Sequence, residues 1–243
     1  MKYGELGKAY PDLKNQFDTF LLTVISIETD DLEMIEEMFS RLNEAAPLTA
    51  PEKRNAYGGP LPVAIKNLAS ETFFTKNIPF PNKRYRHFDL ATKFLFAESQ
   101  RKVVDTKKAY LDDFVKSYQL TSRTKAPPFL KPAQATVRLM ASAFANKDSL
   151  LRQAGMVTVY YHLFRFARQG GWDDQISRKK LLEFDKRRED NKKLAENDLA
   201  SADCNLIEFD RYAQSPNDAG ALKFRLRVML AKVFDRKMQT DDL

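Results

Sequence analysis

One segment of this chain has the composition of a buried β-strand, and no other segment of the sequence resembles it. Residues 20–28 read Phe-Leu-Leu-Thr-Val-Ile-Ser-Ile-Glu, a continuous apolar and β-branched run typical of a strand covered on both faces. A lone strand cannot satisfy its own backbone N–H and C=O groups. We therefore expect a mostly α fold, a multi-helix array with this one N-terminal strand as part of an incomplete α+β sheet. An upstream segment or a partner chain is expected to complete the sheet.

Helical periodicity dominates the rest of the sequence. Residues 150–169 are apolar nearly all round, which predicts a central buried helix, and Gly170-Gly171 ends it by permitting left-handed backbone geometry. Residues 174–196 are charged on every side, which predicts a helix that projects into solvent or lies against a charged partner. The other expected helices are at 31–43, at 50–69 with an interruption at Gly58-Gly59-Pro60, at 88–103, after a cap at Asp105 or Thr106, at 132–146 and at 218–238.

Charged and amide side chains gather at the junction of the first two expected helices. Arg41 and Asn43 fall at the end of the first helix. Thr49-x-x-Glu52 is a capping box that starts the second helix, so Glu52 and Arg54 lie in its first turn. Arginine presents planar paired donors that fit a phosphate or a carboxylate, and a first helical turn offers N–H groups to an anion. The junction therefore has the chemistry of a phosphate-proximal site.

A structural clasp is the alternative interpretation of this junction. In a clasp, Glu52 accepts a hydrogen bond from the Thr49 N–H and pairs with Arg41 across the two helices. In a site, Asn43 and Glu52 orient the two arginines toward a bound anion. Both interpretations stay open.

The same residues carry a family resemblance. Phe39-x-Arg41-Leu-Asn43, a linker with Leu48, and Glu52-x-Arg54-Asn-Ala resemble the middle of the ParB/sulfiredoxin-like domain of GmrSD-type restriction systems. That domain typically reads F-x-R-[LI]-N-x-G-G-x-x-L-x-x-x-E-x-R-N. The match is close over residues 39–56 and holds elsewhere only in outline.

The outline match has two further blocks and two departures. Arg84-Tyr-Arg86-His-Phe-Asp89 is similar to the family's next block, and Asn217-Asp218 with Lys223, Arg225 and Arg227 is similar to its last helix. The paired glycines of the family's linker are Ala45 and Ala46 here. The family's Asp-Gly-Gln-Gln-Arg signature, which is tied to nucleotide hydrolysis, is absent from this chain.

The resemblance implies a domain division and a function. Residues 1–76 correspond to the C-terminal part of a ParB/sulfiredoxin-like domain, and residues 77–243 to a helical domain. Pro127, Pro128 and Pro132, among basic residues, independently predict a linker or hinge at 122–132. The chain is then the C-terminal helical portion of a DNA restriction or phage-defence protein, which supports nucleotide-dependent DNA recognition but lacks the catalytic motif. A nucleoside triphosphate with Mg²⁺, DNA and a nuclease partner belong to the complete assembly. We expect no catalytic residue and no cofactor in this chain, which alone is inactive.

A non-catalytic helical protein–protein interaction module is the second function in play. Such a module would dock onto another protein through the exposed edge of the strand expected at 20–28.

Basic residues gather in two places that suit a nucleic acid. The net charge of +7 is uneven, because residues 28–37 hold six acids and no base. Basic and aromatic residues are interleaved in Lys83-Arg84-Tyr85-Arg86-His87-Phe88, as on surfaces that stack bases. The helix expected at 174–196 carries the second group: Arg178, Lys179, Lys180, Arg187, Arg188, Lys192 and Lys193. In both places the alternative is a solvated surface, with Tyr85 and Phe88 anchoring the helix that follows them.

Several other chemistries lack the residues that they need. Neither a P-loop nor a Gly-x-Gly-x-x-Gly motif occurs. His87 and His162 are the only histidines and Cys204 is the only cysteine, so we expect no metal site and no internal disulfide. The first residues lack the apolar stretch of a signal peptide, and no apolar run reaches membrane-spanning length. We expect a cytoplasmic protein without membrane contact.

Overall fold

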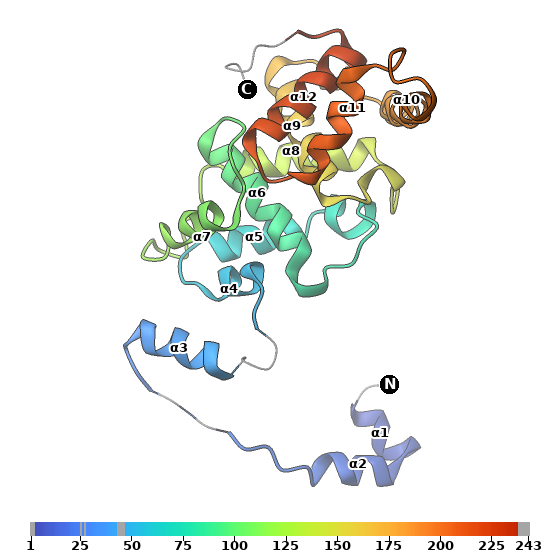
Figure 1. Ribbon diagram of the computed structural model, residues 1–243. Helices are drawn as coiled ribbons and strands as arrows, with labels where there is room; N and C mark the ends of the chain where they lie inside the picture. Colours follow the sequence, from blue (N-terminus) through green and yellow to red (C-terminus); the bar gives the residue numbers. More distant parts are fainter. Residues whose placement is uncertain (1–2, 25, 27, 43–46, 238–243) are drawn as a thin grey trace. The chain divides into compact units, whose positions relative to one another are not determined.

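The computed structural model describes residues 3–24, 26, 28–42 and 47–237, with the side chains of 6, 8 and 40–42 excepted (Figure 1). The chain divides into two compact units, Met1–Pro47 and Leu48–Leu243. Within the described ranges, all regular elements are helical: twelve α-helices, four 3₁₀ helices and one π-helix. The prediction of a mostly α fold is confirmed.

The Met1–Pro47 unit contains helices α1 (Tyr3–Ala9), α2 (Pro11–Asp18) and α3 (Leu32–Leu42). The predicted strand of this unit is wrong for the residues that the structure describes. Phe20–Val24, Ser26 and Glu28 lie outside any helix or strand, and Leu21 is 94% exposed. A β-branched run becomes a strand only where it packs against neighbouring strands, and none occurs in the described part of the chain.

Ile25 and Ile27 of the predicted strand lie outside the described residues. Because the described residues of 20–28 form no strand, the expectation that another segment completes a sheet rests on the family resemblance alone.

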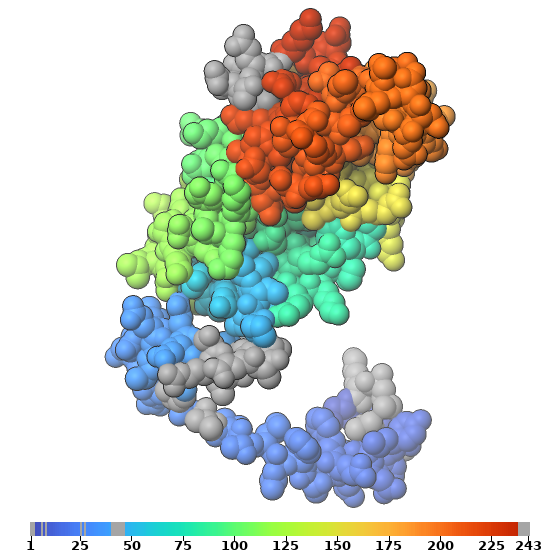
Figure 2. Space-filling view, viewed as in Figure 1, coloured from blue at the N-terminus to red at the C-terminus, as the bar shows by residue number. Residues whose placement is uncertain are grey.

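Nine α-helices build the described part of the Leu48–Leu243 unit. Helices α9 to α12 gather at one end of this unit and α4, α5 and α7 at the other, with α6 and α8 between them (Figure 1). Side chains of the last third of the chain, orange to red, cover one side of the unit in Figure 2. The helices are α4 (Ala50–Ala56), α5 (Leu61–Ala69), α6 (Arg86–Gln100), α7 (Lys108–Lys116), α8 (Leu130–Ala143), α9 (Ala154–Gly170), α10 (Arg178–Asn197), α11 (Cys204–Arg211) and α12 (Ala219–Phe234).

Short helical turns join these helices. A π-helix occupies Phe73–Asn77, and 3₁₀ helices occupy Lys83–Tyr85, Ser149–Leu151, Asp173–Gln175 and Tyr212–Gln214. None of the described helices is both long and apolar enough to cross a membrane.

Helix α9 is the central buried helix that its all-round apolar pattern predicts. It buries an unbroken run from Met156 to Arg165, and the Tyr161 ring stacks on Phe94 of α6 with 3.9 Å between ring centroids. Gly171 follows the helix with φ 66°, which is the left-handed geometry expected of the glycine pair. Burial of such large side chains on every face fixes α9 between α6, α8 and α12.

The predicted helix start at Asp218 and the predicted cap at Asp105 or Thr106 show how local signals succeed or fail. The side chain of Asp218 caps α12 by accepting a hydrogen bond from the Ala221 N–H at 3.1 Å. Asp105 does not cap α7, because its carboxylate accepts instead from the Ala219 N–H at 2.9 Å, and the Thr106 N–H donates to the Asn217 carbonyl. Both residues predicted to begin α7 thus hold the start of α12.

Helix α10 is less solvent-projecting than its charge predicts. It buries Leu181, Phe184 and Asn191. The Asn191 amide exchanges hydrogen bonds with the backbone of Asp203, at 2.7 and 3.1 Å, which ties α10 to the start of α11. One side of the charged helix is therefore fixed to the unit.

Candidate anion-binding cleft

The turn that leads into α6 has an unusual backbone. Arg84 and Tyr85 both have positive φ, 52° and 60°, a left-handed geometry that costs a residue with a Cβ about 1–2 kcal/mol. The Asn82 side chain holds the turn by accepting a hydrogen bond from the His87 N–H at 2.8 Å. Tyr85 stacks on Phe88 with 4.7 Å between ring centroids. The turn fixes its aromatic residues against α6, as the anchoring interpretation predicts.

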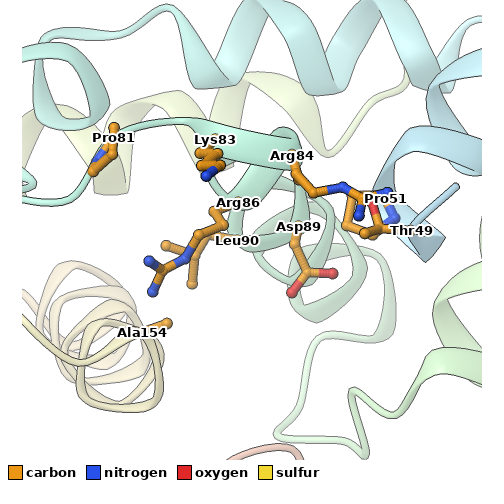
Figure 3. Close-up of a pocket in the computed structure, with 9 residues that line it drawn as sticks. All are labelled: Thr49, Pro51, Pro81, Lys83, Arg84, Arg86, Asp89, Leu90 and Ala154. Carbon is orange, nitrogen blue, oxygen red and sulfur yellow. The ribbon is translucent and has the colours of Figure 1, made fainter. Parts of the chain in front are cut away.

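The basic side chains of this turn line a cleft of about 510 Å³ (Figure 3). Lys83, Arg84 and Arg86 come from the turn and the first residue of α6, and all three are exposed. In Figure 3 the guanidinium of Arg86 extends toward Ala154, the first residue of α9. The other lining residues are Thr49, Pro51, Pro81, Asp89 and Leu90.

Two helix N-termini meet at this cleft. Helices α6 and α9 both begin here, and neither has a cap hydrogen bond from the side chain of its N-cap residue, Tyr85 or Gln153. In α6 the Asn82 side chain already accepts from one first-turn N–H, that of His87. The first turn of α9 contains no acidic residue. A helix N-terminus carries roughly half a positive charge, which favours an anion. The backbone thus adds to the positive charge of the basic side chains.

Asp89, the acidic residue that lines the cleft, forms ion pairs with two cations. Asp89 pairs with Arg54 at 2.5 Å and with Lys93 at 2.9 Å. Among the described residues, no carboxylate lies within ion-pair distance of Lys83 or Arg86, and Arg86 lies over the Phe80 ring, 4.3 Å from its centroid. The cleft therefore carries a net positive charge.

Arg84 differs from its neighbours because it has a carboxylate partner. It donates to both oxygens of Glu52, at 2.9 and 3.2 Å. This hydrogen bond, followed by the one from the Thr49 N–H at 2.6 Å, lowers the pKa of Glu52 to about 2. The predicted capping box is therefore present, and it also holds Arg84 at the edge of the cleft.

Of the residues at the helix junction, the structure describes Glu52 and Arg54 fully. Arg54 is 2% exposed and also pairs with Asp112 at 3.1 Å, so it joins α4 to α6 and α7. These contacts correspond to the clasp interpretation, with partners that differ from the expected one. The side chain of Arg41 and the whole of Asn43 lie outside the described residues.

The basic residues of α10 do not line the cleft. Arg178 pairs with the buried Asp148 at 2.7 Å, and Arg188 pairs with Asp185 at 2.7 Å and with Asp210. The remaining predicted residues of this helix are exposed: Lys179, Lys180, Arg187, Lys192 and Lys193. Lys179 and Arg187 have acidic neighbours, Glu183 and Asp203, at 3.9 and 3.8 Å. Helix α10 therefore offers dispersed lysines on a solvated face.

Sequence reasoning found the basic side chains of the cleft but not its opposite wall. Ala154 lies far along the chain from Lys83, and a small apolar residue at a helix start carries no signal of its own. The missing N-cap side chain at Gln153 is the one local clue, because an uncapped helix start has N–H groups to offer. In the described part of the chain, no group of three or more His, Cys, Asp or Glu side chains is placed to hold a metal ion.

Comparison of the chain with protein-family models, with curated proteins and with solved structures finds no match.

Proposed function

We propose that this chain is a DNA-binding helical component of a GmrSD-like, ParB-like restriction or phage-defence system. In that system it supports nucleotide-dependent DNA recognition, while a nucleoside triphosphate with Mg²⁺ and a nuclease belong to the complete assembly. The family context rests on the sequence resemblance at residues 39–56. DNA binding is the part of the proposal that the geometry supports.

The positively charged cleft carries this proposal. It brings Lys83 and Arg86 together with the starts of α6 and α9, and its acidic residue is already paired. Phosphate contacts from lysine, arginine and helix N-termini supply most of the sequence-independent affinity of DNA-binding proteins. The stacked Tyr85 and Phe88 lie next to these contacts along the chain.

A protein–protein interaction module is the second candidate, and the Met1–Pro47 unit favours it. Leu32, Ile35 and Phe39 form the apolar stripe of α3, and they are 55%, 42% and 55% exposed. The run at Phe20–Val24 is also exposed. An exposed apolar stripe on a helix is typical of a docking segment.

DNA binding by the full chain tests the first candidate. Fluorescence anisotropy with labelled duplex and single-stranded oligonucleotides at low salt should show binding. Lys83→Ala with Arg86→Ala should weaken it by about tenfold or more. The matched control, Lys192→Ala with Lys193→Ala, removes the same charge from α10 and should change affinity little. Absence of DNA binding by the unmodified chain, or equal losses in the two double variants, would refute the cleft as the DNA site and favour the interaction module.

A further inference from the structure

Arg225 of α12 is a buried cation without a counter-ion. It is 1% exposed, and its Nε and Nη1 atoms have no hydrogen-bond partner. Its Nη2 lies 3.2 Å from the Met156 sulfur, and its guanidinium lies 4.7 Å from the centroid of the Phe209 ring. Burial lowers the pKa of Arg225 to about 10, so the side chain stays charged at neutral pH. An uncompensated buried charge is strongly unfavourable and needs an explanation.

The other fully buried arginines of the described chain do have carboxylate partners. Arg54 pairs with two of them, and Arg165 of α9 pairs with Glu98 at 3.4 Å. No carboxylate of the described residues lies within ion-pair distance of Arg225. Asp210, the acidic side chain that affects the pKa of Arg225, is already bound to Arg188.

Met156, which contacts the Arg225 guanidinium, lines a cavity of about 340 Å³. Arg225 itself does not line the cavity, so a ligand in the cavity reaches the guanidinium only if Met156 moves. Methionine has three rotatable bonds and moves easily between conformations. Helices α9, α11 and α12, which surround Arg225, lie side by side in the Leu48–Leu243 unit (Figure 1).

The charged groups of the cavity suit an anion that also carries hydrogen-bond donors. Arg152 is exposed at the cavity wall, and its Nε donates to the Ser149 carbonyl at 3.0 Å. Arg188 is neutralised by its two carboxylate partners. Asp185 and Glu189 also line the wall and can accept hydrogen bonds from a ligand. Gln153, the residue before α9, also lines this wall.

We propose that this cavity is a second, separate binding site, for a small molecule that carries a phosphate or carboxylate group together with hydroxyl or amino donors. Its anionic group binds Arg225 once Met156 moves aside, and Arg152 contacts the same group from the mouth of the cavity. The donors of the ligand face Asp185 and Glu189. The ligand then supplies the counter-charge that the protein does not.

Isothermal titration calorimetry of the full chain at constant ionic strength tests this site. The probes are glycerol 3-phosphate for the phosphate class and glycerate for the carboxylate class, with sodium chloride as the blank. Binding of either probe supports the proposal and identifies the class. Arg225→Met, which keeps the apolar stem of the side chain, should abolish that binding. Arg227→Met removes one charge from the same helix and should leave affinity within about twofold.

Arg152→Gln keeps the test decisive if Arg225→Met fails to fold, because Arg152 is exposed. It should weaken binding by about tenfold at unchanged melting temperature. Binding of neither probe to the unmodified chain, or unchanged affinity in the folded Arg225→Met or in the Arg152→Gln variant, overturns the proposal. Lys83→Ala with Arg86→Ala should leave this binding intact, so failure here and failure of the DNA cleft are separate results.

Discussion

The basic turn before α6 and the basic helix α10 look alike in the sequence but differ in where their counter-charges lie. In α10, Arg178 and Arg188 are bound to carboxylates of the protein, so these cations hold helices together. In the cleft, the acidic residue is paired instead, while Lys83 and Arg86 have no carboxylate within ion-pair distance among the described residues. A basic segment is therefore a candidate anion site only where nearby carboxylates are already bound to other cations. The number of its positive charges does not decide this.

The largest expected effect comes from removing a paired cation next to the cleft. Arg54→Met leaves Asp89 and Asp112 without their shared partner, and we expect the free energy of unfolding to fall by about 3 kcal/mol. Urea denaturation at pH 7 measures this change. Arg86→Met, which removes an exposed cation that lines the cleft, should change stability by less than about 0.5 kcal/mol. Equal free energies of unfolding for the two variants would contradict the claim that paired cations stabilise the fold more than unpaired ones.

A smaller, pH-dependent effect is expected in α10. Burial alone would raise the pKa of Asp148, but hydrogen bonds from Arg178 and from the Leu150 and Ala145 N–H groups hold it below its ordinary value. Its stabilising contribution is thus present above the ordinary carboxyl pKa of about 4 and is lost as the pH falls through the lower folded value. Arg178→Gln should weaken this contribution, so acid unfolding begins at higher pH.

Circular dichroism during acid titration checks that shift. Lys179→Gln is the matched control, because Lys179 is exposed and 3.9 Å from its acidic neighbour. Coincident acid-unfolding curves for the two variants would mean that Arg178 is no more structural than a surface lysine.

Local signals predicted much of the helical fold. The Thr49–Glu52 capping box, the helix start at Asp218 and the Gly170-Gly171 end all lie where the sequence places them, because each depends on residues within a few positions. The predicted strand at 20–28 did not appear in its described residues, since a strand depends on partners that no local run can supply. Asp105 does not cap α7 for a similar reason, because its carboxylate accepts a hydrogen bond from Ala219 at the distant start of α12.

The candidate site was only half predictable. Interleaved basic and aromatic residues identified Lys83, Arg84 and Arg86, but the pairing of Asp89 with Arg54 joins residues distant in sequence. The burial of Arg225 has no sequence signal either, because its neighbours Met156 and Phe209 come from two other helices. Counter-charges are set by tertiary packing, and they decide which cations are available to a ligand.

The salt dependence of DNA binding tests the central claim most directly. The logarithm of the binding constant for duplex DNA falls linearly with the logarithm of salt concentration, with a slope of about −0.9 for each phosphate contact. Removing Lys83 and Arg86 together should reduce the magnitude of this slope by about 1.8, whereas removing Lys192 and Lys193 should leave it unchanged. An unchanged slope without Lys83 and Arg86, or an equal reduction in both double variants, would contradict the claim that unpaired cations make the cleft the DNA site.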